Sequence, residues 1–461
     1  MKVLKINNIY LYAIVFAILI IGISSDLPFF WDTILTSTIT QHFYNNGFQN
    51  FIIPTELDAG HPPLFYVYVT VLYHLLGKSL FTAHLAILPF TILGIVSFIQ
   101  LMISFSFNKK QQIIGIILFF SIPAVITQNT LVSYDVVLLS LYLAALVNYL
   151  KLNKILFSFI LIGIACITLR GLFCMASLSV TIYFLEKRNI NGWIKWNFLF
   201  LPAIIICGCW YYYHYTQTGW LFATTSSGWS EQRGFTDFKG SFKNCISLAR
   251  CFFDLGVVVL LALSFFFLAQ KRKPDAYTYL WIIPALLFSI AFLPFRNPIN
   301  HRYFLIVYVL MLLPVIQFLS ERKIIYTVFT ALILLFGHFQ IYPVPISNGW
   351  DCTLVYLSYI SAKDDFDNLN ARDFRIDKSK VGTVFPMNTS LYQTNMNGDT
   401  VRLINVNGKT IDSVPFILYS NVGNDFSDKQ INQLKNWTSI ASFNRNQIDM
   451  ILYKNPALNP K

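Results

Sequence analysis

Charged residues are scarce in this sequence. Only 12% of its 461 residues are charged, whereas 55% are hydrophobic and 17% are aromatic. A soluble domain carries about 25% charged residues, so this chain has too little polar surface for an ordinary soluble protein. Backbone that crosses hydrocarbon must satisfy its own hydrogen bonds, and long apolar runs do so as helices. The composition therefore predicts a mostly α, multi-pass membrane protein.

The motifs of several other protein classes are missing as well. The sequence has no GxxxxGK[ST] and no GxGxxG after a predicted strand, so no nucleotide site is indicated. It has no paired CxxC or HxxxH spacing, so no zinc site is expected. The net charge of +12 comes from short Lys and Arg clusters between apolar runs rather than from a basic stripe. Nucleic acid is therefore not expected as a partner.

Eleven apolar runs separated by polar breaks occupy the chain up to about Ile341. We expect each run to be a membrane span, although several are shorter than the roughly 20 residues that a span needs. The runs are Ile9–Ser24, Leu80–Phe105, Ile113–Thr130, Val136–Leu150, Ile155–Leu169, Leu172–Leu185, Trp196–Tyr213, Cys251–Ala269, Tyr277–Leu293, Tyr303–Leu319 and Ile324–Ile341.

The Lys and Arg clusters predict the orientation of these runs. They fall in alternate connections, and placing those connections in the cytoplasm satisfies the positive-inside rule. The N-terminus is then cytoplasmic, and everything after Ile341 is outside. This assignment requires that the short apolar run Leu64–Leu76 does not cross, and that the apolar arms on either side of Arg170 form a hairpin of two spans. We therefore expect a multi-pass membrane protein, and the aliphatic, Asn- and Lys-containing sequence suggests a bacterial source and thus an inner membrane.

Two domains follow from this topology. Residues 1–345 form the membrane domain, with residues 27–78 as one long external loop. Residues 346–461 form a small soluble α/β domain outside the membrane. Alternating stretches predict strands within Val381–Pro386, Thr400–Asn405 and Val414–Tyr419, and Phe426–Trp437 predicts a helix that Ser427 caps.

The first external loop is acidic and carries one candidate base. Asp32 follows three aromatic residues directly after the first run, where partial desolvation would raise its basicity and suit it to accept a proton from a hydroxyl. A plain N-cap is the other interpretation, because Asp is favoured just before a helix. His61 precedes Pro62 and Pro63, which would direct its side chain toward whatever the loop covers. A rigid start to a surface helix explains the same prolines.

Further ionisable residues lie at the outer ends of later runs. Asp135 opens one run, and both function and helix capping explain a carboxylate there. Arg170 and Arg302 lie at outer boundaries, against the positive-inside trend. A guanidinium binds two phosphate oxygens at once, so these arginines suit a lipid phosphate, although such side chains also extend to ordinary headgroups.

The candidate site combines a catalytic base with residues that bind the donor phosphate and residues that bind the sugar or the acceptor. The catalytic base is Asp32, and the donor phosphate is bound by His61, Arg170, Arg302 and Arg296. Sugar or acceptor binding is assigned to Asp135, Glu56, Asp58, His301 and Tyr303. No cofactor and no metal are expected. The partners are membrane lipids, a lipid-linked sugar and a glycan, lipid or protein acceptor.

The order of these motifs resembles a known superfamily. Trp31-Asp32 in the first loop, His61-Pro62-Pro63-Leu64, Asp135 at the start of a run, Leu169-Arg170-Gly171-Leu172 and Arg302-Tyr303-Phe304-Leu305 follow one another along the membrane part. Together they resemble the GT-C superfamily of integral membrane glycosyltransferases. The closest branch is the group of protein O-mannosyltransferases and lipid A aminoarabinose transferases.

This resemblance implies a polyprenyl-phosphate sugar donor and transfer with inversion at the anomeric carbon. It implies that Asp32 is the base and that the family's cation near the fifth span, often Lys, is Arg170 here. The acidic neighbour that the family usually has beside the first-loop Asp is replaced by Thr33, so we expect no metal.

Two other functions remain as alternatives. A transporter or flippase of lipid-linked sugars would explain the many runs, but it predicts an internal repeat and charges near the membrane midplane, which the sequence lacks. A polymerase or ligase of lipid-linked sugars would use external Arg and His residues without the early Asp.

Overall fold

The computed structural model describes residues 8–222, 224, 233–271, 275–339, 349–369, 380–387, 403–422 and 426–458. The chain divides into two compact units. The first is Met1–Asp26 with Ile39–His338, and the second is Leu27–Thr38 with Phe339–Lys461. The division falls inside one helix, α2 (Asp32–Asn46). The segment that carries Asp32 is therefore grouped with the C-terminal part of the chain, whereas the expected boundary at residue 345 places it in the membrane domain.

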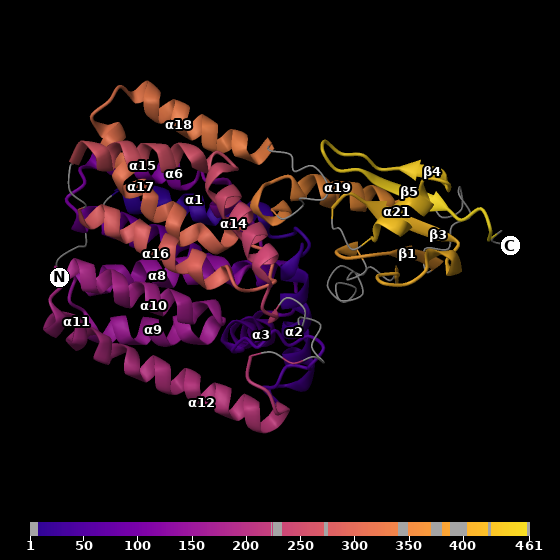
Figure 1. Ribbon diagram of the computed structural model, residues 1–461, viewed down its shortest axis with the longest axis horizontal. Coiled ribbons are helices and arrows are strands. Elements are labelled where there is room, and N and C mark those ends of the chain that lie inside the picture. Colours follow the sequence, from indigo (N-terminus) through magenta and orange to yellow (C-terminus); the bar gives the residue numbers. More distant parts are fainter. Residues whose placement is uncertain are drawn as a thin grey trace. The chain divides into compact units, whose positions relative to one another are not determined.

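The first unit is helical in its described part (Figure 1). Its helices are α1 (Asn8–Ser24), α3 (Leu64–Leu76), α4 (Leu80–Leu85), α5 (Leu88–Ser104), α6 (Lys109–Phe119), α7 (Pro123–Thr130), α8 (Tyr134–Leu150), α9 (Lys154–Ile167), α10 (Arg170–Leu185), α11 (Ile190–Asn197), α12 (Leu201–Thr218), α14 (Phe238–Phe253), α15 (Val257–Lys271), α16 (Ala276–Phe292), α17 (Leu305–Ser320) and α18 (Ile324–Phe336). Each of the eleven apolar runs is helical over most of its described residues, and Leu64–Leu76 forms α3.

Several of these helices are long and apolar enough to cross a membrane. Three stretches qualify on their own, namely Leu80–Ser104, Ile190–Thr218 and His301–Ser320. Two more qualify as bent pairs, because α6 meets α7 at 66° and α14 meets α15 at 82°. Seven shorter apolar helices complete the set found among the described residues. The protein is therefore a mostly helical, multi-pass membrane protein, and the count of eleven spans stays a prediction.

Helix α8 and helix α17 lie at the centre of the first unit. Nearly every side chain of α17 between Leu305 and Ile316 is buried, and most of α8 is buried as well. Helix α8 packs against α5, α9 and α17, while α17 also packs against α6, α15 and α16. A helix that is apolar on all sides is covered either by other helices or by lipid, and the burial of α8 and α17 shows that other helices cover these two. Neighbouring helices therefore hold α8 in place. Asp135 is the second residue of this helix.

The second unit contains a five-stranded mixed sheet. The strands are β1 (Val381–Thr383), β2 (Ile404–Asn405), β3 (Phe416–Ser420), β4 (Thr438–Ser442) and β5 (Met450–Lys454), in the order β2-β1-β3-β5-β4. Strand β1 pairs in parallel with β2 and β3, and β5 pairs antiparallel with β3 and β4. The first two predicted strand regions contain β1 and β2, and the third overlaps β3, which ends one residue later at Ser420. Thr400 to Arg402 lie outside the described residues.

The second unit also contains the α-helices α21 (Asp428–Leu434) and α19 (Tyr356–Asp367). Helix α21 begins after Ser427, whose hydroxyl accepts from the Gln430 amide while the Gln430 side chain accepts from the Ser427 amide. This capping box confirms the predicted helix and its cap. Leu434 packs into an apolar core with Val406, Ile417 and Trp437. Helix α19 contributes Phe366, whose ring meets Phe443 at 5.8 Å.

Candidate active site

Asp135 lies at the start of α8. Ser133 is the N-cap residue, and its hydroxyl accepts a hydrogen bond from the Asp135 amide at 3.1 Å. The Asp135 carboxylate is therefore in the first turn, where the helix dipole favours a negative charge. Its side chain is only 3% exposed. Burying a carboxylate costs several kcal/mol unless cations compensate it, so its partners matter.

Arg170 is the first of these partners, and the hairpin between α9 and α10 places it. Helix α9 ends at Ile167 and α10 begins at Arg170, so the turn is Thr168 and Leu169 rather than Arg170 and Gly171 as predicted. A Cβ atom at Gly171 would lie 1.9 Å from the Ile164 carbonyl oxygen. Only glycine therefore allows the two helices to come this close, and the close approach holds Arg170 at the end of the hairpin.

Arg302 is the second partner of Asp135. Arg170 Nη1 forms an ion pair with Asp135 Oδ1, and Arg302 Nε lies 3.7 Å from Asp135 Oδ2. The ring of Tyr303 lies beneath both cations, at 4.4 Å from Arg170 Cζ and 5.3 Å from Arg302 Cζ. Tyr134 supplies a further aromatic face, at 5.3 Å from Arg170. Aromatic faces attract guanidinium groups and help to hold them where water is scarce.

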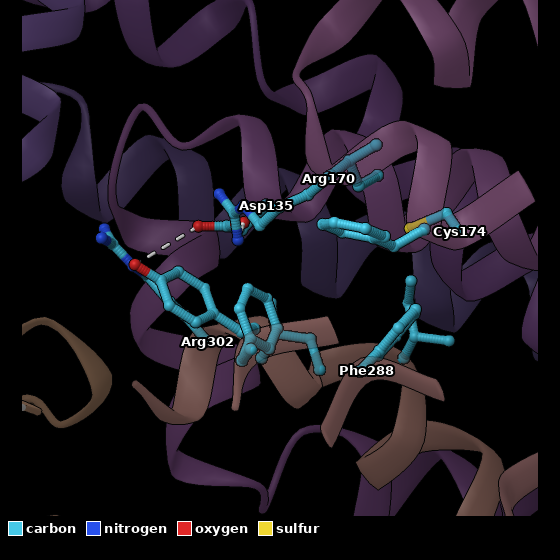
Figure 2. A pocket seen from close by; sticks show the side chains of 11 residues that line it. Asp135, Arg170, Cys174, Phe288 and Arg302 are labelled. Carbon is cyan, nitrogen blue, oxygen red and sulfur yellow. Dashed lines mark ion pairs between the residues drawn. The ribbon is translucent and has the colours of Figure 1, made fainter. Parts of the chain in front are cut away.

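These residues line one pocket, which is charged at one end and apolar at the other. Figure 2 shows Asp135, Arg170 and Arg302 together, with Cys174 and Phe288 away from them along the pocket. The lining is Asp135, Leu138, Arg170, Phe173, Cys174, Phe288, Phe292, Arg302, Tyr303, Leu305 and Ile306. Two guanidinium groups share one carboxylate, so the polar end has a net positive charge. Such a pocket is suited to a small anionic group that carries a hydrocarbon chain.

His61 does not line this pocket but contacts the turn before Arg170. Its Nδ1 accepts a hydrogen bond from the Leu169 amide at 3.3 Å, one residue before Arg170. Its Nε2 lies 3.4 Å from Arg233 Nη2. Burial, then the charges of Arg233 and Arg170, hold the pKa of His61 well below its usual 6.5. The ring is therefore neutral at pH 7 and positions the start of α10, while direct phosphate binding by His61 stays a prediction.

The neutral His61 makes the protein sensitive to acid. An unfolded chain binds a proton at this ring near pH 6.5, whereas the folded chain binds it only at lower pH. Stability is therefore lost as the pH falls below 6.5, by at most about 1.4 kcal/mol per pH unit from this group. We expect the thermal midpoint of the purified protein to fall between pH 7.5 and pH 5. The variant His61→Gln keeps an acceptor for Leu169 and should show a smaller fall. An equal fall in both proteins would contradict this account.

Arg233, which contacts His61 and does not line the pocket, was missed by the sequence analysis. One of its terminal nitrogens donates to the Ala59 carbonyl oxygen and faces the His61 ring. Burial lowers the pKa of Arg233, and its position next to Arg170 contributes to the same effect. Like Arg170, it lies in a segment that the charge pattern assigns to the outer side. That same signal, applied to every Arg of the external loops, would have found it.

Asp32 belongs to the second unit and begins α2. It is half-buried and lies in the first turn of the helix, where a carboxylate is favoured. Asp32 is therefore the first residue of the helix rather than the N-cap residue before it. Its role as catalytic base stays a prediction.

The other predicted site residues do not line the pocket. Asp58 is buried, and its carboxylate pairs with His214 Nε2 at 2.9 Å. This pair joins the first loop to α12. Glu56 is exposed in a nearby turn. Arg296 is exposed and donates to the Phe235 carbonyl oxygen at 3.1 Å. His301 is fully buried beside Arg302. The structure thus brings together Asp135, Arg170, Arg302 and Tyr303, and the binding roles of all the predicted site residues stay predictions.

The described residues contain no cluster of three or more His, Cys, Asp or Glu that is placed to hold a metal ion. A DxD triplet, a motif that can hold a metal-bound nucleotide, occurs at Asp365–Asp367 in α19. Its two acidic side chains pair with Arg445 and Lys363. These ion pairs indicate a structural role for the triplet.

The chain thus combines a helical membrane unit, which contains the charged pocket, with a second unit that contains a small mixed sheet. No known family profile matches the chain, and no curated protein sequence matches it. Two solved structures do share its fold. They are crystal structures of ArnT from Cupriavidus metallidurans, one bound to undecaprenyl phosphate and one in the apo state.

The likeness to ArnT extends over the whole of both chains. It covers 98% of this chain and 99% of ArnT, with TM-scores of 0.54 and 0.55 and 13% sequence identity. ArnT is a lipid A aminoarabinose transferase, so the predicted resemblance to that group is confirmed at the level of the fold.

Proposed function

We propose that this protein is a glycosyltransferase that uses a polyprenyl-phosphate-linked sugar as its donor. The single observation that carries the proposal is the pocket in which Arg170 and Arg302 converge on Asp135 beside an apolar wall. The fold supports it, because ArnT, which has a similar fold, was crystallised with undecaprenyl phosphate. The acceptor is a glycan, lipid or protein on the outer face of a bacterial inner membrane.

The reaction requires a base for the acceptor hydroxyl and a leaving group on the donor. A hydroxyl oxygen of the acceptor attacks the anomeric carbon, and its proton passes to the Asp32 carboxylate. The bond between the anomeric carbon and the phosphate oxygen breaks, and its electron pair stays on the polyprenyl phosphate. Attack opposite the leaving group inverts the anomeric carbon.

The charge of the pocket suits this leaving group. A polyprenyl-phosphate sugar is a phosphodiester with one negative charge, and the phosphate gains a second charge as the sugar leaves. Guanidinium groups that are already in place stabilise this growing charge more than they stabilise the donor, which is the condition for catalysis. Asp135 keeps both arginines in position without neutralising them fully.

Sugar transfer in membranes tests the proposal. Membranes that contain the wild-type protein would be supplied with radiolabelled polyprenyl-phosphate sugars, and the labelled product would be separated from the donor. We expect incorporation from at least one lipid-linked sugar and none from the matching nucleotide sugar. Movement of the intact lipid-linked sugar across vesicles without transfer would instead support the transporter alternative. Chain extension of the lipid-linked glycan would support the polymerase.

A further inference from the structure

The second unit, hereafter the C-terminal unit, includes the segment that carries the proposed base. Residues Leu27–Thr38 pack with this unit. Phe30 is fully buried, and its ring lies 5.5 Å from Tyr356 and 5.2 Å from Tyr359, both on α19. The C-terminal unit thus anchors the residue two positions before Asp32.

Local hydrogen bonds fix the backbone next to this anchor. The Thr33 hydroxyl donates to the Phe30 carbonyl oxygen at 2.7 Å and accepts from the Phe30 amide at 3.0 Å. The Ile34 amide donates to the Trp31 carbonyl oxygen at 3.0 Å. These hydrogen bonds close the first turn of α2, which contains Asp32. The direction of this turn depends on the backbone of Trp31.

Trp31 has a backbone conformation that bulky residues rarely adopt. Its φ is 55°, in the left-handed region, and such conformations persist only where the surroundings hold them. Its ring is half-buried and meets the ring of Phe385 edge-on at 5.1 Å. Phe385 follows β1 by two residues, so the sheet of the C-terminal unit positions it.

We infer that Phe385 is a positioning residue that acts through Trp31 to orient the Asp32 carboxylate. The C-terminal unit then contributes to catalysis by holding the segment that carries Asp32. This inference rests on the proposed function, in which Asp32 is the base. Phe385 touches Trp31 rather than the reacting atoms, so its loss should slow the chemical step and leave donor binding intact.

A double-mutant cycle in the full-length protein tests the inference. We expect Phe385→Ala and Trp31→Ala each to lower kcat by on the order of tenfold to a hundredfold, with an unchanged KM for the donor, because a small misplacement of a catalytic group has effects of this size. The double variant should be no slower than the slower single variant, since both changes break one chain of contacts. Phe385→Tyr keeps the ring and should restore kcat.

Controls separate positioning from a general loss of folding. Phe443→Ala removes a ring of the same unit that packs on Phe366, and its effect should add to that of Trp31→Ala. Normal kcat in Phe385→Ala, or additive effects of Phe385→Ala and Trp31→Ala, would overturn the inference alone. If Asp32→Asn is as active as the wild type, the proposed base and this inference both fall.

Discussion

Replacing Asp32 by Asn is expected to lower the rate of sugar transfer by about 10² to 10⁴, which is the usual contribution of a general base. Asn has the same shape as Asp but binds no proton at neutral pH. It is also accepted in the first turn of a helix, where the lost carboxylate costs at most about 1 kcal/mol. The folded amount of protein should therefore stay normal while kcat falls. Initial rates with a labelled polyprenyl-phosphate sugar measure this directly.

The C-terminal unit offers a matched control for Asp32→Asn. Asp428 is the first residue of α21, as Asp32 is of α2, and its side chain is exposed. Asp428→Asn makes the same chemical change at the same helical position, so we expect its rate to lie within twofold of the wild type. Near-normal turnover by Asp32→Asn would eliminate the base. An equal loss in both variants would show that helix stability, rather than proton transfer, is affected.

The sequence predicts the helical part of this fold well because long apolar runs have few alternatives in a membrane. The runs from Ile9 to Phe339 are helical over most of their described residues, and the hairpin at Arg170 is present. The breaks inside two runs were not predicted. At Asp254 to Gly256 the chain turns by 82°, where a charged Asp and a Gly interrupt the apolar run Cys251–Ala269. Strand β4 was also missed, because Thr438–Ser442 is short and largely polar. Strand β5 was missed as well, although Met450–Lys454 is mostly apolar.

The sequence indicated that Asp135, Arg170 and Arg302 share one surface, but it did not predict which of these side chains pair with one another. The position of each residue at an outer helix end placed Asp135, Arg170 and Arg302 on one surface. Which arginine would meet the carboxylate depends on how α8, α10 and α17 pack, and no local pattern records that packing. The grouping of Phe30 with Tyr356 and Tyr359 joins residues more than 300 positions apart. Only the folded chain shows it.

Replacing Arg170 by Ala is the second change with a large expected effect. Charge-assisted hydrogen bonds contribute about 1.5–3 kcal/mol, so losing the contact with the donor phosphate should lower kcat/KM by roughly tenfold to more than a hundredfold. The variant also leaves the buried Asp135 carboxylate with Arg302 Nε at 3.7 Å as its charged partner. Breaking a buried pair in this way typically destabilises a protein by about 3–5 kcal/mol. Activity and thermal stability should both fall.

Further variants distinguish the loss of phosphate binding from the loss of stability. Arg170→Lys keeps the charge beside Asp135 but loses the planar fork that binds two phosphate oxygens. We expect it to fold normally and still to require more donor for half-maximal rate. Free polyprenyl phosphate should inhibit the wild type and should inhibit Arg170→Lys only at higher concentration. Arg322→Ala, which removes an exposed Arg just after α17, is the matched control and should leave both values unchanged. If Arg170→Lys keeps the donor dependence and product inhibition of the wild type, Arg170 does not bind the phosphate, and its role is to neutralise Asp135.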